Sequence, residues 1–166
     1  IGFVAGYAVL ELRAAEGLIA LGLALMLGAE ALGSLVLGVV ADRRGCRPVF
    51  VVAASCGTLL YGAMALSPPI GLVLGAYALY GLLLSALAVG STMTMELAPP
   101  RRTATFSAVV FSAMAPVRVA GPIALGALAD VAGTGPVFAI AAAASALGLY
   151  LAAARLPDPR RPVAVG

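Results

Sequence analysis

The sequence predicts an all-α membrane protein with one partial and five full transmembrane helices. Apolar residues make up 63% of the 166 residues, charged residues make up only 10%, and the mean hydropathy is +1.11. A soluble domain carries about 25% charged residues, so the composition alone indicates a membrane protein. The charges are also clustered, and they leave uncharged runs close to the roughly 20 residues that a helix needs to cross a bilayer.

Residues 1–10 are apolar but too short to span a membrane. They have no basic start and no cleavage-like site, so we interpret them as the end of a helix rather than as a signal peptide. Because the chain also opens without methionine, we expect a fragment of a longer protein.

Proline, glycine and arginine then divide the chain into five apolar segments. The breaks are an arginine-rich turn before Pro48, the segment Ser67-Pro68-Pro69, the segment Pro99-Pro100-Arg101-Arg102, and Gly133-Thr134-Gly135-Pro136. The predicted spans are 17–41, 49–67, 70–95, 103–131 and 136–154. Residues 1–155 form the predicted transmembrane domain, and the proline-rich residues 156–166 form a predicted cytoplasmic tail.

The arginines predict the orientation of these spans. Arg13 falls on one face of the predicted membrane domain, Arg118 lies within a span, and eight others fall on the opposite face: Arg43, Arg44, Arg47, Arg101, Arg102, Arg155, Arg160 and Arg161. The positive-inside rule makes the face with eight arginines cytoplasmic, together with the C-terminus. The expected location is a bacterial inner membrane.

The turn between the first two full spans carries a recognisable pattern. It reads Gly-x-x-x-Asp-Arg-x-Gly-x-Arg, from Gly38 through Asp42, Arg43 and Gly45 to Arg47. It resembles the loop signature of the major facilitator superfamily of secondary transporters, where it joins the second and third helices of a six-helix half. The resemblance implies a gating role for Asp42, which would accept hydrogen bonds from arginines or face a helix N-terminus in the missing half. A simple cytoplasmic cap is the alternative.

A second copy of part of this pattern indicates a duplicated architecture. The segment from Gly38 to Gly45 and the segment from Gly126 to Gly133 both read Gly-x-x-Ala-Asp-x-x-Gly. Two three-helix units of opposite orientation are typical of each half of this superfamily. The C-terminal half is favoured over the N-terminal half, because residues 76–80 lack the arginine often found early in the fourth helix and because the chain ends in a polar tail.

The segment from Glu96 to Pro99, followed by Arg102, is similar to the Glu-x-x-Pro-x-x-x-Arg segment of sugar-porter-like members, although its spacing is shorter. The resemblance implies that Glu96 pairs with Arg43 or Arg47 and forms a charge latch on the inner face. The alternative is a solvated charge at a helix end.

Two charges lie near the middle of predicted spans, Glu30 in 17–41 and Arg118 in 103–131. Burying a charge in hydrocarbon costs roughly 3 kcal/mol on insertion scales, so each is expected to face a cavity or a partner. Arg118 suits an anionic substrate group, and Glu30 suits a proton carrier. The alternative, which the sequence leaves open, is a structural Glu30–Arg118 ion pair.

Helix-bending and small residues surround Arg118. Pro116 and Pro122 remove backbone hydrogen bonds and can bend the span, and Gly121 and Gly126 are expected to allow close helix packing. The segment from Arg118 to Pro122 also resembles the arginine-bearing eleventh helix of monocarboxylate and oxalate-type carriers.

The predicted function is therefore secondary active transport of a small solute by alternating access, with a proton-coupled organic anion carrier as the first interpretation. The alternatives are a drug or metabolite exporter of the same superfamily and a non-transporting receptor or scaffold. An enzyme is not expected, because histidine, paired cysteines and clustered carboxylates are absent from the sequence. No cofactor or metal is expected. The expected partners are the bilayer, a small-molecule substrate, which is anionic under the first interpretation, and the missing N-terminal half, but no nucleic acid.

Overall fold

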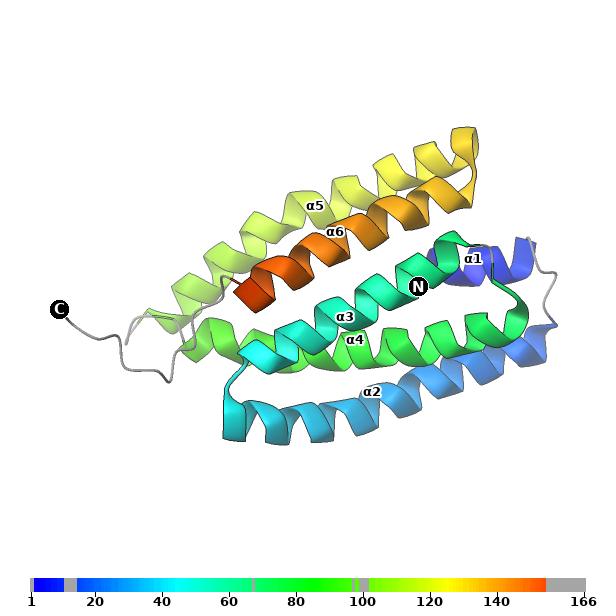
Figure 1. Cartoon of the computed structure of the whole chain (residues 1–166). Coiled ribbons are helices and arrows are strands. Elements are labelled where there is room, and N and C mark those ends of the chain that lie inside the picture. Colours follow the sequence, from blue (N-terminus) through cyan, green and yellow to red (C-terminus); the bar gives the residue numbers. More distant parts are fainter. Residues whose placement is uncertain (1, 11–14, 67, 97, 99–101, 155–166) are drawn as a thin grey trace.

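The protein is a bundle of α-helices (Figure 1). A computed structural model describes residues 2–10, 15–66, 68–96, 98 and 102–154. No strand occurs within these residues, and the helices are α1 (Gly2–Leu10), α2 (Glu16–Arg44), α3 (Arg47–Ala65), α4 (Ile70–Glu96), α5 (Thr103–Ala132) and α6 (Thr134–Ala154). Five of them are long and apolar enough to cross a membrane. The predicted all-α fold class is confirmed.

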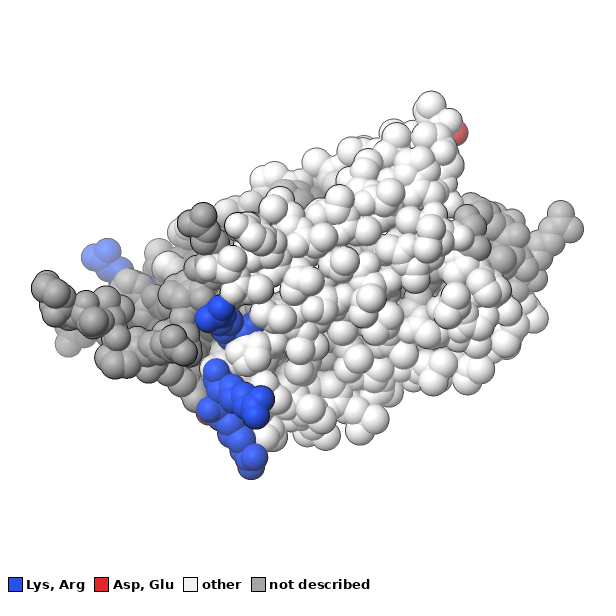
Figure 2. All heavy atoms as spheres, viewed as in Figure 1, with Lys and Arg blue, Asp and Glu red and all other residues white. Residues whose placement is uncertain are grey.

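The helix ends gather at two ends of the bundle. The turn from α2 to α3, the start of α5 and the end of α6 lie at one end, and the turns from α3 to α4 and from α5 to α6 lie at the other (Figure 1). We call the first of these the basic end, because it carries Arg43, Arg44, Arg47 and Arg102. The long surface between the two ends shows almost no charge in the view of Figure 2.

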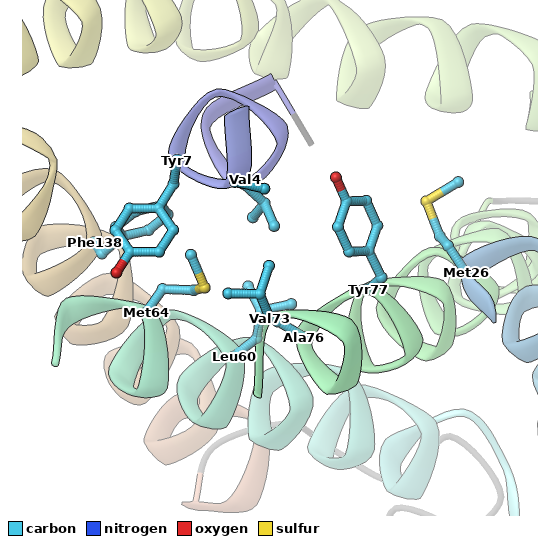
Figure 3. Close-up of a cluster of buried hydrophobic side chains, with 10 residues drawn as sticks. Val4, Tyr7, Met26, Leu60, Met64, Val73, Ala76, Tyr77 and Phe138 are labelled. Carbon is cyan, nitrogen blue, oxygen red and sulfur yellow. The ribbon is translucent and has the colours of Figure 1, made fainter. Parts of the chain in front are cut away.

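The helices pack in pairs. α2 lies along α4, α3 lies along α6 and also contacts α4, and α5 rests on α6 and α4. Buried apolar side chains form one cluster toward the end opposite the basic end, where Tyr7 of α1 meets Phe138 of α6 edge-to-face with ring centroids 6.4 Å apart (Figure 3). The Tyr7 hydroxyl donates a hydrogen bond to the Pro68 carbonyl at 3.4 Å. A second cluster, around Cys46 and Val49, lies at the basic end.

Small residues bring α2 and α4 into close contact. Gly22 of α2 faces the ring of Tyr77, and Gly33 faces the Ser85 hydroxyl. A Cβ added at Gly81 of α4 would clash with the Met26 carbonyl oxygen. Since lipid removes the hydrophobic drive between helices, close packing of this kind is the main source of helix association in a membrane.

The internal repeat is longer than the eight-residue echo. The interval from Gly45 to Gly133 also places three other α2 positions on residues of the same type in α5: Met26 on Met114, Gly33 on Gly121 and Leu37 on Leu125. It then places Pro48-Val49-Phe50, at the start of α3, on Pro136-Val137-Phe138 near the start of α6. Val49 and Val137 are both buried. The repeat unit therefore includes α2 with α3 and α5 with α6.

Contacts between α3 and α6 follow the same repeat. Gly57 of α3 faces Ser145 of α6, and these two residues are each other's equivalents. Arg47 of α3 reaches the Ala153 carbonyl of α6, and its equivalent Gly135 lies beside the Ala65 carbonyl of α3. Contacts that are reciprocal in this way indicate two-fold symmetry. An approximate two-fold axis therefore passes between Gly57 and Ser145, as expected for inverted repeats.

Candidate functional site: a basic loop and two midspan charges

A glycine with an unusual backbone conformation ends α2. Gly45 has φ 81° and ψ 176°, and its N–H donates to the Ala41 carbonyl at 2.8 Å. This backbone region is essentially restricted to glycine, so the glycine of the loop pattern has a structural reason. Pro48 then stands in the first turn of α3, where its missing N–H has no helical partner to lose. The loop is consequently short and keeps its arginines beside the end of α2 and the start of α3.

The arginines of this loop differ in their surroundings. Arg43 and Arg44 are exposed on the last turn of α2, as is Asp42. Arg47 is half-buried, and its guanidinium donates to the Ala153 carbonyl at 2.5 Å. The last carbonyls of a helix have no intrahelical donor, so Arg47 caps the end of α6.

The predicted charge latch involves groups that are only partly described. Glu96 is the last residue of α4, but its side chain lies outside the described part of the structure, so its pairing with Arg43 or Arg47 stays a prediction. Arg102 precedes the first turn of α5 and is exposed. Together with Thr105, Phe106 and Val109 it lines a groove of about 260 Å³.

Glu30 is the central residue of α2 and is half-buried. Its backbone nitrogen lies close to Gly81, on the side where α2 packs against α4. The tight helix contact therefore fixes the depth at which the carboxyl is held.

Arg118 occupies the middle of α5, but its side chain lies outside the described part of the structure. Pro116 and Pro122 flank it, and α5 remains one helix from Thr103 to Ala132. Cβ atoms added at Gly121 and Gly126 would meet nothing within 4 Å. The predicted packing role of these two glycines therefore has no partner among the described residues.

Glu30 and Arg118 are equivalent positions of the internal repeat. The interval that carries Gly45 onto Gly133 also carries Glu30 onto Arg118. Comparison of the short echo alone missed this relation. Extending it at the same interval, through the methionine pair Met26 and Met114, would have revealed it from the sequence.

Tyrosines form a feature that the sequence did not assign to a site. Tyr61 and Tyr80 line a cavity of about 110 Å³ with Val4, Leu125 and Phe138 among the other walls. The nearby Tyr77 is 1% exposed, and its hydroxyl has no hydrogen-bond partner among the described residues. The described residues contain no group of three or more metal-ligating side chains.

These features define a helical membrane protein built from an inverted repeat. Each copy of the repeat carries one charge at the middle of a helix, Glu30 in α2 and Arg118 in α5. The family model described as Major Facilitator Superfamily matches residues 1–165. The chain belongs to this superfamily, so it is an integral membrane protein and part of a membrane transporter. Searches of curated proteins and of solved structures found no match.

Proposed function

We propose that the chain is the C-terminal six-helix half of a secondary transporter that moves a small organic anion by alternating access and couples this movement to protons. Arg118 binds the anionic group of the substrate, and Glu30 carries the proton. The equivalence of Glu30 and Arg118 in the internal repeat carries this proposal.

Equivalent positions of an inverted repeat lie at the same depth when the repeat axis lies in the membrane plane. Glu30 is the midpoint of α2, and Arg118 is one of the two central residues of α5. A charge at such a depth costs roughly 3 kcal/mol or more on a lipid-facing surface. A pair of opposite charges at matched depth is therefore best explained by a shared aqueous cavity.

The packing of the helices supports substrate binding over a structural ion pair. α2 rests on α4 and α3, whereas α5 rests on α6 and α4. The two helices that carry the charges share α4 as a neighbour, but within the described residues they are not packed along each other. A guanidinium that is not neutralised by Glu30 can bind a carboxylate through two parallel hydrogen bonds.

The basic end supplies the proposed inner gate. Because its hydrogen bond to the Ala153 carbonyl holds Arg47 at the end of α6, we assign Arg43 as the partner of Glu96 in the latch, with Asp42 and Arg102 beside them. The excess of arginines at this end supports a cytoplasmic orientation for it and for the C-terminus, in the inner membrane of a bacterium. Alternating access then requires the N-terminal half, which rocks against this one around the central site.

The roles of the two charges are tested in the full-length transporter reconstituted in vesicles. Arg118→Ala should reduce uptake of an organic anion on the order of 30-fold or more, because truncating one partner of a buried charge pair costs at least 2 kcal/mol. Glu30→Gln should retain anion exchange but lose accumulation driven by a pH gradient.

Glu16→Gln is the matched control, since Glu16 is an exposed carboxylate in the first turn of the same helix. It should transport like the unmodified protein. Normal transport and normal proton coupling in both Arg118→Ala and Glu30→Gln would refute the assignment.

A further inference from the structure

A groove runs between α3, α4 and α6 near the basic end. It has a volume of about 210 Å³, and its walls include Phe50, Ala53, Leu83, Leu87, Gly148 and Ala152. The small side chains of α3 and α6 leave the space open, and the two leucines of α4 form its apolar floor. The walls fit a hydrocarbon chain.

Arginines stand at one end of this groove. The hydrogen bond from Arg47 to the Ala153 carbonyl fixes its guanidinium beside the wall residue Ala152. A guanidinium carries five N–H donors, so one bond to a carbonyl does not exhaust it. The exposed Arg43 and Arg44 end α2 just before the same turn, and the three arginines outnumber the two carboxylates of this end, Asp42 and Glu96.

The surface around the groove is suited to hydrocarbon. α6 has no charged residue from Thr134 to Ala154, and the only charge of α3 is Arg47 at its first position. Figure 2 shows basic side chains at one end of the viewed face of the molecule and an uncharged expanse beyond them. An apolar groove beside the arginines suits an acyl chain whose headgroup lies level with them.

We propose that this groove is a binding site for an anionic phospholipid. One acyl chain lies on Leu83 and Leu87, and the phosphate is bound by Arg47 with Arg44 beside it. Arginine binds phosphate oxygens through paired hydrogen bonds, and the net positive mouth selects a headgroup with net negative charge.

The internal repeat supplies a built-in contrast. The positions equivalent to Arg43, Arg44 and Arg47 are Val131, Ala132 and Gly135, at the other end of the bundle. That end offers no guanidinium at these three positions, so the proposed selectivity belongs to one leaflet only.

The test is native mass spectrometry of the full-length transporter titrated with phosphatidylglycerol or with phosphatidylcholine of the same acyl chains. The unmodified protein should retain phosphatidylglycerol in preference to phosphatidylcholine. Gly148→Leu should weaken this binding about tenfold or more, because the added side chain takes the space of several methylene groups. A Cβ at Gly148 meets nothing within 4 Å, so the new side chain starts in open space beside the groove.

Two control variants separate the groove from general effects. Gly62→Leu adds the same side chain to another open position on α3, outside the groove, and should leave lipid binding unchanged. Arg44→Gln should weaken phosphatidylglycerol binding about fivefold, as expected for one basic residue near a charged lipid surface, and should not alter phosphatidylcholine binding. Arg102→Gln, at the same end but on α5, should have no effect.

Equal retention of the two lipids by the unmodified protein would overturn the proposal, as would unchanged phosphatidylglycerol binding in Gly148→Leu. Equal losses in Arg44→Gln and Arg102→Gln would show diffuse attraction rather than a site. If Gly148→Leu instead converts a dimer into a monomer in the same spectra, the groove is covered by a second copy of the chain, and the lipid assignment is wrong.

Discussion

The turn from α2 into α3 and the turn from α5 into α6 share a backbone conformation but differ in charge. Gly45 and Gly133 both have φ 81°, with ψ 176° and 177°, and their N–H groups donate to Ala41 and Ala129 at 2.8 and 2.9 Å. The first turn carries arginines, whereas the second carries valine and alanine at the equivalent positions. Backbone geometry and membrane orientation are therefore specified by different residues of the same short segment.

The helices before these turns differ in a second way. α2 is packed along α4 through Gly22 and Gly33, but the equivalent of Gly33, Gly121, has open space around it. Under the repeat, the counterpart of α4 is α1 (Gly2–Leu10), and a Cβ added at Gly121 meets none of the described residues within 4 Å. The glycine at this position of the repeat thus has a close partner in the first copy, at Gly33, and none among the described residues in the second, at Gly121.

The largest expected difference follows from these glycines. Gly33→Leu should lower the free energy of unfolding by about 1–3 kcal/mol or more, because its side chain meets Ser85 and Leu82 of α4 in a close-packed interface. Gly121→Leu should change it little. Unfolding of the detergent-solubilised chain in increasing SDS measures both. Equal losses would show that α5 has a close partner as α2 does.

The two turn glycines should behave alike. Gly45→Ala and Gly133→Ala should each cost about 1–3 kcal/mol, since both place a Cβ in a backbone region that only glycine adopts readily. Gly28→Ala, at an open position within α2, is the control and should be neutral or stabilising. The same SDS titration applies, and a cost at only one of the turns would contradict their equivalence.

A smaller effect is expected for the cap of α6. Arg47→Gln should cost about 1 kcal/mol, because it removes a charge-assisted hydrogen bond to the Ala153 carbonyl from a half-buried site. Hydrogen exchange of the last turn of α6 should increase in this variant. Arg44→Gln, with an exposed side chain on the neighbouring helix end, should leave that exchange unchanged.

The smallest expected effect tests the two-fold relation between α3 and α6. Gly57→Ser alone should be mildly destabilising, because a Cβ there would lie 3.0 Å from the Ser145 hydroxyl. The double variant Gly57→Ser with Ser145→Gly exchanges the pair across the axis and should return the stability to within about 0.5 kcal/mol. Failure of the exchange to restore stability would show that the two sides of the axis are not interchangeable.

Run lengths and break residues were enough to predict the helical fold, because a membrane requires every backbone group to be bonded within a helix or a closed barrel. The pairing of α2 with α4 and of α3 with α6 could not be read in the same way. These helices are apolar on every side, so their sequence does not mark a face that must be buried.

Part of the candidate site could likewise be predicted from the sequence, and part could not. The loop pattern and the two midspan charges stand out because charges are rare in this chain. The hydrogen bond of Arg47 had no such signal, since its acceptor is a backbone carbonyl that any residue supplies. The sequence prompted a search for a carboxylate partner, whereas the structure bonds Arg47 to the end of another helix.

The two-fold contact between Gly57 and Ser145 has a consequence for the origin of this fold. An interface in which each residue meets its own equivalent can form between two separate copies of one three-helix unit inserted in opposite directions. Such a unit must be able to insert into the membrane in either orientation. Here the residues that set the orientation, Arg43 and Arg44, are exposed and lie outside the packed interfaces. Loss of arginines from one fused copy would fix its orientation without repacking a single helix.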